Sequence, residues 1–270
     1  MKDLLLEIED LSVRDGEQRI LDRVNLKIPE KEIISILGET GSGKTTLAKS
    51  ISGILPRGLK AEGKIFYCSR NGKVDLNGLS AKERNAYRGR EILWIPQNSG
   101  ASLNPLLSLE RQLLLPMIKR LKMSGQEARR EIEEIFDLLG LNPGEKILKS
   151  YPHQLSGGMK VRVMIAVGLA MKSRLLILDE PTKGLDADRC AGLTELIRDM
   201  LCRFSLTVIL ISHDLEMVER HTQYSAILYQ GRLVDSGSTE EVLFHRPHSY
   251  VCALRKALPA HGMEVSDFEC

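Results

Sequence analysis

Hydrophobic and polar positions alternate in the first part of the chain, which predicts β-strands. Leu4–Val13 and Ile20–Ile28 alternate roughly, and Asp15-Gly16-Glu17 between them has the composition of a turn. Ile33–Leu37 is a short, unbroken apolar run, as in a strand that is buried on both faces. A glycine-rich loop follows, and Thr45–Ile54 then predicts a helix. The chain therefore begins with strands and continues into a strand–loop–helix unit.

The spacing of apolar residues becomes helical between residues 98 and 172. Leu106–Leu121 and Gln126–Leu139 carry apolar residues three and four positions apart, and Ser156–Met171 predicts a third helix. Beyond this segment, apolar runs alternate with helical patterns, which favours a parallel sheet with crossover helices. The other predicted elements are the strands Lys64–Tyr67, Ile92–Ile95, Leu175–Leu178, Thr207–Ile211, Ala226–Tyr229 and Arg232–Val234, and the helices Ala187–Phe204 and Glu240–Lys256, the last interrupted by Pro247.

The composition is that of an ordinary soluble globular protein, with 43% hydrophobic and 27% charged residues among 270. The net charge of +2 does not indicate a general affinity for nucleic acid. The longest apolar stretches, such as Val163–Met171, are far shorter than the ~20 residues that span a bilayer. Acidic residues interrupt the N-terminal apolar residues, unlike in a secretory signal, so we expect the chain in the cytoplasm.

Residues 38–45 read Gly-Glu-Thr-Gly-Ser-Gly-Lys-Thr and fit the phosphate-loop pattern G-x-x-x-x-G-K-[ST]. The loop lies between a predicted strand and a predicted helix, and this context argues against a chance match. Backbone N–H groups of such a loop converge on phosphate oxygens. We expect Lys44 to reach the β- and γ-phosphates and the Thr45 hydroxyl to ligate Mg²⁺, so the loop predicts MgATP binding. The predicted nucleotide-binding residues here are Gly38, Glu39, Thr40, Gly41, Ser42, Gly43, Lys44, Thr45 and Thr46.

Two adjacent carboxylates follow the apolar run Leu175–Leu178. Neighbouring strand residues point to opposite sides, so Asp179 and Glu180 can have different roles. Asp179 would hold the Mg²⁺ shell, and Glu180 would act as general base toward the attacking water. An acidic pair alone is weak evidence, because many strands end in solvated acids. The presence of a phosphate loop in the same sequence is what makes the pair strong evidence for a nucleotide site.

Two polar residues after other predicted strands leave two interpretations open. His213 would either contact the γ-phosphate or have a structural role. Gln97 belongs either to the nucleotide site or to an ordinary loop.

The segment Leu155-Ser156-Gly157-Gly158-Met159 completes a set of motifs in a fixed order, and with it the chain resembles the ATP-binding-cassette (ABC) ATPases over residues 4–257. The resemblance implies an α/β nucleotide-binding domain: a phosphate-loop core with a mainly parallel sheet, an N-terminal antiparallel β subdomain and an inserted helical subdomain. The core would comprise residues 1–97 and 173–237, the helical insert 98–172, and a C-terminal helical tail 238–270. The matching motifs are the phosphate loop, Gln97 of the Q-loop, the signature Leu155–Met159, the Walker B segment Leu175–Glu180, the D-loop Gly184-Leu185-Asp186 and the switch residue His213.

The resemblance also implies how the site works. Two cassettes pair head to tail, and each ATP lies between the phosphate loop of one subunit and the signature of the other. Ser156, Gly157 and Gly158 would then bind the partner's nucleotide, because a helix N-terminus forms an anion site. The implied catalytic residues are Glu180, His213 and Gln97, and the implied metal ligands are Thr45, Gln97 and Asp179.

Three further segments resemble the ATPases of peptide and nickel importers: Ala101–Pro105, Tyr151–Gln154 and Arg246–Tyr250. A motor subunit for import of oligopeptides, nickel or a metal chelate is therefore the favoured interpretation. It implies two integral membrane permease subunits docked on the helical insert, a second ABC ATPase that is a sister subunit rather than a copy, and indirectly an external substrate-binding protein. The chain would then lie peripherally at the cytoplasmic face of the cell membrane. The alternative is a phosphonate-lyase-associated or other non-transport ABC ATPase, and the charge balance argues against a nucleic-acid partner.

Three positions depart from the family pattern. ABC ATPases usually stack adenine on an aromatic residue where this chain has Asp15, and Arg14 is the candidate replacement through its planar guanidinium. The sequence therefore predicts poor discrimination between ATP and GTP. Lys160 stands where glutamine is frequent after the signature, and Lys183 replaces a small residue before the D-loop. Neither lysine is expected to take part in the chemistry.

Overall fold

Two sheets form the centre of the protein, whose computed structural model describes residues 3–69, 72–183, 187–245 and 248–257. One sheet is antiparallel, with strand order β2-β1-β4-β5, and the other has the order β10-β9-β3-β8-β7-β6. All neighbours in the second sheet are parallel except β9 and β10. The strands are β1 Leu4–Asp15, β2 Gln18–Pro29, β3 Ile33–Leu37, β4 Leu59–Ser69, β5 Gly72–Asp75, β6 Ile92–Ile95, β7 Leu175–Asp179, β8 Thr207–Ser212, β9 Tyr224–Tyr229 and β10 Arg232–Ser238.

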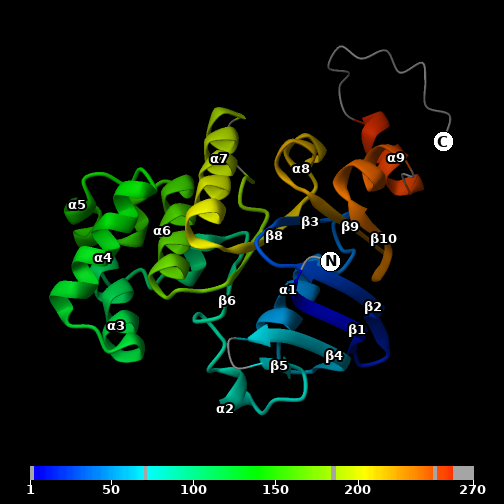
Figure 1. Cartoon of the computed structure of the whole chain (residues 1–270), viewed down its shortest axis with the longest axis horizontal. Helices are drawn as coiled ribbons and strands as arrows, with labels where there is room; N and C mark the ends of the chain where they lie inside the picture. Colours follow the sequence, from blue (N-terminus) through cyan, green and yellow to red (C-terminus); the bar gives the residue numbers. More distant parts are fainter. Residues whose placement is uncertain (1–2, 70–71, 184–186, 246–247, 258–270) are drawn as a thin grey trace.

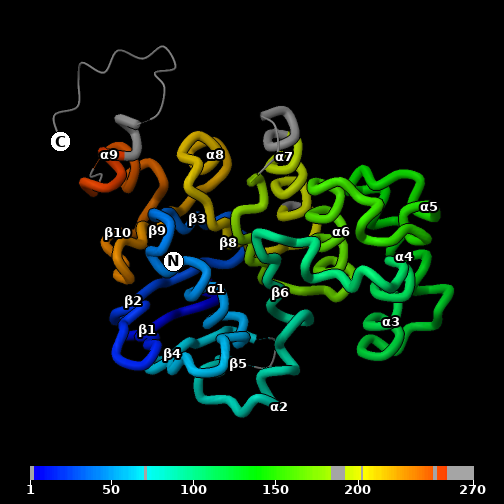
Figure 2. Tube along the Cα trace, turned by 180° about the vertical axis from the view of Figure 1, so that it is seen from behind, coloured from blue at the N-terminus to red at the C-terminus, as the bar shows by residue number. Residues whose placement is uncertain are grey.

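The helices divide into a group around the sheets and a group at one end of the molecule. Figure 1 shows α3, α4 and α5 at that end, far from the antiparallel sheet, with α6 and α7 between them and the parallel strands. The view from behind shows α9 beside β9 and β10, at the other end (Figure 2). The helices are α1 Lys44–Ser52, α2 Ala81–Arg84, α3 Leu109–Leu121, α4 Gly125–Leu138, α5 Gly144–Lys149, α6 Gly157–Ala170, α7 Ala187–Phe204, α8 Leu215–His221 and α9 Ser249–Ala257.

The parallel strands are apolar along their whole length because both faces of their sheet are covered. On one face, Ile34 and Ile36 pack with Leu47 of α1 and with the antiparallel sheet. On the other face, Leu176 and Leu178 pack with the helices of the inserted segment and with α7. Alternation along each strand sends successive side chains into these two cores. The predicted α/β class with a mainly parallel sheet, an antiparallel β part and inserted helices is confirmed.

Some predicted boundaries were wrong. The helix predicted from Leu106 begins at Leu109, because the side chain of Asn104 accepts a hydrogen bond from the Leu106 N–H (3.0 Å) and holds the preceding residues in a turn. Leu106 is 83% exposed. The strand predicted as Lys64–Tyr67 extends over Leu59–Ser69, because its charged residues lie on the exposed face of the pair with β1.

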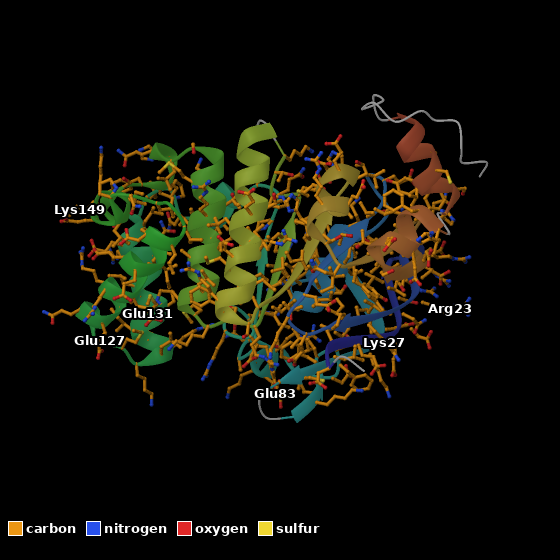
Figure 3. The ribbon with its side chains drawn as sticks, turned by 45° about the horizontal axis from the view of Figure 1, so that its top comes forward. Arg23, Lys27, Glu83, Glu127, Glu131 and Lys149 are labelled. Atoms are coloured by element: carbon orange, nitrogen blue, oxygen red, sulfur yellow. The ribbon has the colours of Figure 1, made fainter. Side chains whose placement is uncertain are left out.

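Charged side chains project from both ends of the molecule (Figure 3). Glu127 and Lys149 extend from α4 and α5, and Arg23 and Lys27 extend from β2.

Among the described residues, no helix has both the length and the apolar character that crossing a bilayer requires.

Candidate nucleotide-binding and catalytic site

The phosphate loop, residues 38–43, connects the carboxyl end of β3 to the start of α1. It is packed closely on both sides. A Cβ on Gly38 would lie 2.2 Å from the carbonyl oxygen of Leu228, and Gly43 has a φ of 102° with Leu21 only 2.6 Å from the position of a Cβ. Both positions therefore require glycine. The backbone of the loop is held between β9 and β2 and leads directly into the N-terminus of α1.

Lys44 is the first residue of α1, and its side chain runs back under the loop. It is 7% exposed, and its Nζ donates to the carbonyl oxygens of Gly38 (2.7 Å) and Glu39 (2.8 Å). Burial lowers the pKa of Lys44, whereas the nearby carboxylates of Glu180 and Asp179 oppose that shift. The ammonium is thus fixed inside the loop that is predicted to enclose the phosphates.

Thr45 and Asp179 are in direct contact, as expected for two ligands of one metal ion. The Thr45 hydroxyl donates to Asp179 Oδ2 over 2.8 Å, which joins the first turn of α1 to the end of β7. Burial raises the pKa of Asp179, and the hydrogen bond from Thr45 acts in the opposite direction. A hydroxyl and a carboxylate that converge in this way are oxygen ligands of the kind that Mg²⁺ prefers. The residues present therefore fit a magnesium ion.

Glu180 lies at the centre of a cluster of three polar side chains. Its Oε1 is 3.1 Å from His213 Nδ1, and its Oε2 accepts from Gln97 Nε2 over 3.4 Å. The residue has a left-handed φ of 48°, and its N–H donates to the carbonyl oxygen of Ile211 (2.9 Å). A non-glycine residue is rare in this conformation and often marks a functional position. The ends of β6, β7 and β8 thus bring together Gln97, Glu180 and His213, which are far apart in the sequence.

Gln97 and Glu180 line a cavity of about 230 Å³ together with Lys44, Thr45 and Asp179, whereas His213 is not among its described lining residues. Most of the predicted residues on its wall come from the phosphate loop and the acidic pair. Two further residues, Ile20 and Lys183, were not predicted to belong to it. No local pattern distinguishes Ile20 from other strand residues. Lys183 was visible as a departure from the family pattern, and the prediction that it takes no part in the chemistry stays a prediction. The full lining is Ile20, Thr40, Gly41, Gly43, Lys44, Thr45, Thr46, Gln97, Asp179, Glu180 and Lys183.

The signature residues lie elsewhere on the chain. Ser156 precedes α6, and its hydroxyl accepts from the Met159 N–H over 3.3 Å, so it caps this helix. Ser156 and Gly157 are exposed, and among the described residues none of the signature lines the cavity. The structure therefore does not bring the signature and the phosphate loop of one chain together. The D-loop residues Gly184–Asp186 lie outside the described residues.

The positions considered for adenine stacking do not reach the cavity either. Asp15 is exposed at the end of β1, and Arg14 is half-buried beside it. Arg14 Nε is buried and has no hydrogen-bond partner among the described residues. Ile20 is the apolar side chain among the described lining residues of the cavity.

A family model described as ABC transporter matches residues 21–183, which is more than half of the chain. The chain is 35% identical over 261 residues to the oligopeptide transport ATP-binding protein OppD of Bacillus subtilis, covering 94% of this chain and 72% of OppD. It is 34% identical over 266 residues to the metal-staphylopine import system ATP-binding protein CntD of Staphylococcus aureus, covering 97% of each. It is 35% identical over 268 residues to the dipeptide transport ATP-binding protein DppD of Escherichia coli, covering 96% of this chain and 80% of DppD.

Solved structures show the same fold. The chain resembles cbiO1 from Clostridium perfringens, part of the ABC transporter complex cbiONQ, with a TM-score of 0.76 and 28% identity over 89% of this chain and 91% of cbiO1. It also resembles a dimeric ABC transporter cassette in a post-hydrolysis state bound to ADP and Pi, with a TM-score of 0.75 and 28% identity over 87% of this chain and 99% of the cassette.

Proposed function

Because this chain belongs to the ABC transporter family, we propose that it is the ATP-hydrolysing motor subunit of an importer for oligopeptides, nickel or a metal chelate. The similarity to OppD, CntD and DppD supports this range of substrates. The observation that carries the proposal is the convergence of a phosphate loop, a hydroxyl–carboxylate pair and a hydrogen-bonded glutamate in one cavity.

The proposed hydrolysis assigns each side chain one task. Lys44 holds the β- and γ-phosphates and neutralises charge that grows on them. Glu180 accepts a proton from a water whose oxygen attacks the γ-phosphorus, and the bond from that phosphorus to the oxygen bridging to the β-phosphate breaks as ADP leaves. His213 and Gln97 each hold one carboxylate oxygen of Glu180, so the base is oriented before the substrate arrives.

Thr45 and Asp179 would hold the magnesium ion, with Gln97 as a third candidate ligand at the same cavity. Bound there, Mg²⁺ would neutralise charge on the β- and γ-phosphate oxygens.

Ser156, Gly157 and Gly158 are proposed to complete the site of a second ABC ATPase rather than their own. They lie at the exposed N-terminus of α6, away from the cavity of the same chain. A sister subunit that pairs head to tail would bring its own signature to this chain's phosphates. Such a pair requires both subunits for turnover.

Glu180→Gln tests the proposal directly. The variant loses the general base but keeps the size of the side chain, so we expect steady-state phosphate release to fall at least about 100-fold while ATP binding remains. Glu219→Gln, an exposed glutamate on α8, is the matched control and should keep full turnover. Lys44→Ala should weaken ATP binding itself. Undiminished phosphate release by Glu180→Gln would remove Glu180 from this role.

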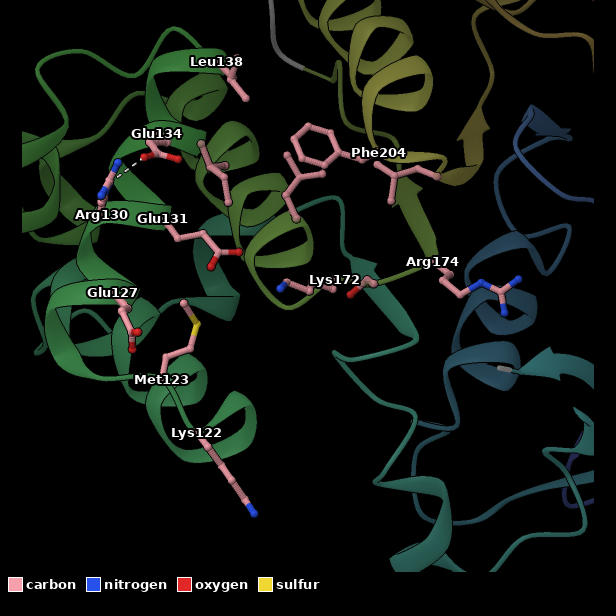
Figure 4. A pocket seen from close by; sticks show the side chains of 14 residues that line it. Lys122, Met123, Glu127, Arg130, Glu131, Glu134, Leu138, Lys172, Arg174 and Phe204 are labelled. Atoms are coloured by element: carbon pink, nitrogen blue, oxygen red, sulfur yellow. Dashed lines mark hydrogen bonds and ion pairs between the residues drawn. The ribbon is translucent and has the colours of Figure 1, made fainter. Parts of the chain in front are cut away.

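We further propose that a permease docks in a groove of about 980 Å³ between the inserted helices and the core. Figure 4 shows Met123, Glu131 and Leu138 on the α4 side of this groove and Lys172 and Phe204 on the side opposite. Leu138 and Phe204 are 37% and 40% exposed. Apolar side chains flanked by both signs of charge suit an amphipathic helix of a membrane subunit.

The groove also supports the proposed division of the chain. Residues 98–172 would form the helical subdomain that receives the permeases, and residues 1–97 with 173–237 would form the ATPase core. Residues 238–270 would form the tail. An importer of this kind further implies a substrate-binding protein outside the membrane and a peripheral position of this chain at the cytoplasmic face.

A further inference from the structure

Lys183 is a second lysine on the wall of the nucleotide cavity. It lines the cavity together with Thr40 and Gly41 of the phosphate loop and with Glu180. Its side chain is exposed, unlike that of Lys44. The hydrolysis proposed above gives it no task.

The backbone of Lys183 is fixed relative to Glu180. Residues 180–183 form a turn in which the Lys183 N–H donates to the Glu180 carbonyl oxygen over 3.2 Å, and Pro181 occupies the second position. Proline favours this turn because its φ is already restricted. The Glu180 N–H is in turn bonded to Ile211 of β8. The turn therefore holds Lys183 at the same edge of the sheet as the proposed general base.

Lys183 adds a second positive charge to the described cavity wall. Lys44 is opposed by two carboxylates, Asp179 and Glu180, so without Lys183 the titratable groups of the wall carry a net negative charge. Lys44 is already hydrogen-bonded to the loop, Asp179 to Thr45, and Glu180 to His213. Within the part of the chain that the structure describes, the ammonium of Lys183 has no hydrogen-bond or ion-pair partner.

We propose that Lys183 binds the terminal phosphate of the ATP held by its own phosphate loop. The proposal rests on the nucleotide site described above. Lys44 serves the β- and γ-phosphates from inside the loop, and Lys183 approaches from the Glu180 side, where only ATP has a phosphate. Lys183 would therefore raise the preference of the subunit for ATP over ADP, because a charge-assisted hydrogen bond is gained with one nucleotide and not with the other.

The test measures binding of the β,γ-imido analogue of ATP and of ADP, each with Mg²⁺, to the full chain by calorimetry. We expect Lys183→Ala to weaken binding of the analogue about three- to tenfold and to leave ADP binding within about twofold. Lys183→Arg should keep the affinity for the analogue, since it keeps the charge. Lys82→Ala, at an exposed lysine of α2, is the matched control and should change neither affinity.

Two results would overturn the role of Lys183: an unchanged affinity of Lys183→Ala for the analogue, or an equal loss for the analogue and for ADP. Lys44→Ala separates this failure from a failure of the nucleotide site itself. The proposed nucleotide site is wrong if the unmodified chain binds neither nucleotide. It is also wrong if Lys44→Ala binds both nucleotides with the affinity of the unmodified chain. In either case the proposed role of Lys183 fails with the site. If Lys44→Ala is weakened and Lys183→Ala is not, only the role of Lys183 fails.

Discussion

The two hollows of this protein lie at opposite ends of the same parallel strands. The nucleotide cavity is built from residues that follow or end β3, β6 and β7, whereas the groove is lined by Arg174 and Leu206, which precede β7 and β8. The cavity measures about 230 Å³ and the groove about 980 Å³. The larger hollow is thus the one without the phosphate loop.

The two hollows differ in how their polar groups are held. In the cavity, Lys44, Thr45, Asp179 and Glu180 are each hydrogen-bonded to another residue of the site. In the groove, Arg130 pairs with Glu134 on its own helix, and exposed apolar residues stand between the charges. Preorganised polar groups suit chemistry on a small ligand, and exposed apolar groups suit a protein partner. Volume alone would point to the groove, whereas the hydrogen-bonded polar groups point to the cavity as the site of the chemistry.

Among the tests that compare the two hollows, the largest effect is expected when the groove is altered and the cavity is left intact. Leu138→Asp combined with Phe204→Asp should reduce the fraction of the protein that sediments with membranes of the host cell at least about tenfold, because two apolar contacts become charges. ATP affinity should stay within about twofold. Val234→Asp, which changes a similarly exposed residue on β10, is the control. Membrane association that survives the double variant would assign docking to another surface.

A smaller effect is expected from the cavity in the absence of ligand. Burial raises the pKa of Asp179 in the folded protein. The protonated carboxyl therefore stabilises the fold below the ordinary carboxyl pKa, and this stabilisation is lost as the pH rises through the raised pKa. At neutral pH, Asp179→Asn should therefore stabilise the free protein by about 1 kcal/mol, or about 2–4 °C in Tm. The same variant should weaken Mg²⁺-dependent ATP binding. The gain should shrink on acidification, and Asp199→Asn on α7 should show neither change. If Asp179→Asn has a lower Tm than the unmodified protein at pH 7, burial of the charged Asp179 does not destabilise the free protein.

The smallest difference is expected between nucleotides that differ only in the base. Ile20 is the apolar side chain in the described lining of the cavity, and neither Arg14 nor Asp15 lines it, so we expect the base to contact Ile20. Apolar contact discriminates weakly between purines, whereas hydrogen bonds to the base would discriminate strongly. We expect ATP and GTP affinities within about threefold in parallel titrations. A large preference for ATP would mean that polar groups recognise the base.

Much of the site was predictable because its residues form local motifs. The phosphate loop, the acidic pair and the residue after β8 each follow a short apolar run, and parallel strands bring their carboxyl ends to one edge. The helix boundary at Leu109 was missed because the Asn104 side chain accepts a hydrogen bond from the Leu106 N–H and holds the preceding residues in a turn. The short elements β5, α2, α5 and α8 were missed because a few residues carry too little periodic signal.

The sequence by itself predicted the chemistry: which residues would bind phosphate, which would hold a metal ion and which would activate water. These functions depend on residue types at fixed short spacing, and a chain of this order places them at one sheet edge. Only the tertiary structure decided which distant side chains share the cavity. Ile20 arrives from the antiparallel sheet, and Lys183 arrives on a turn fixed by Pro181 and β8. The place of Ile20 depends on how the two sheets pack, and the place of Lys183 depends on where the fold puts the turn that Pro181 favours.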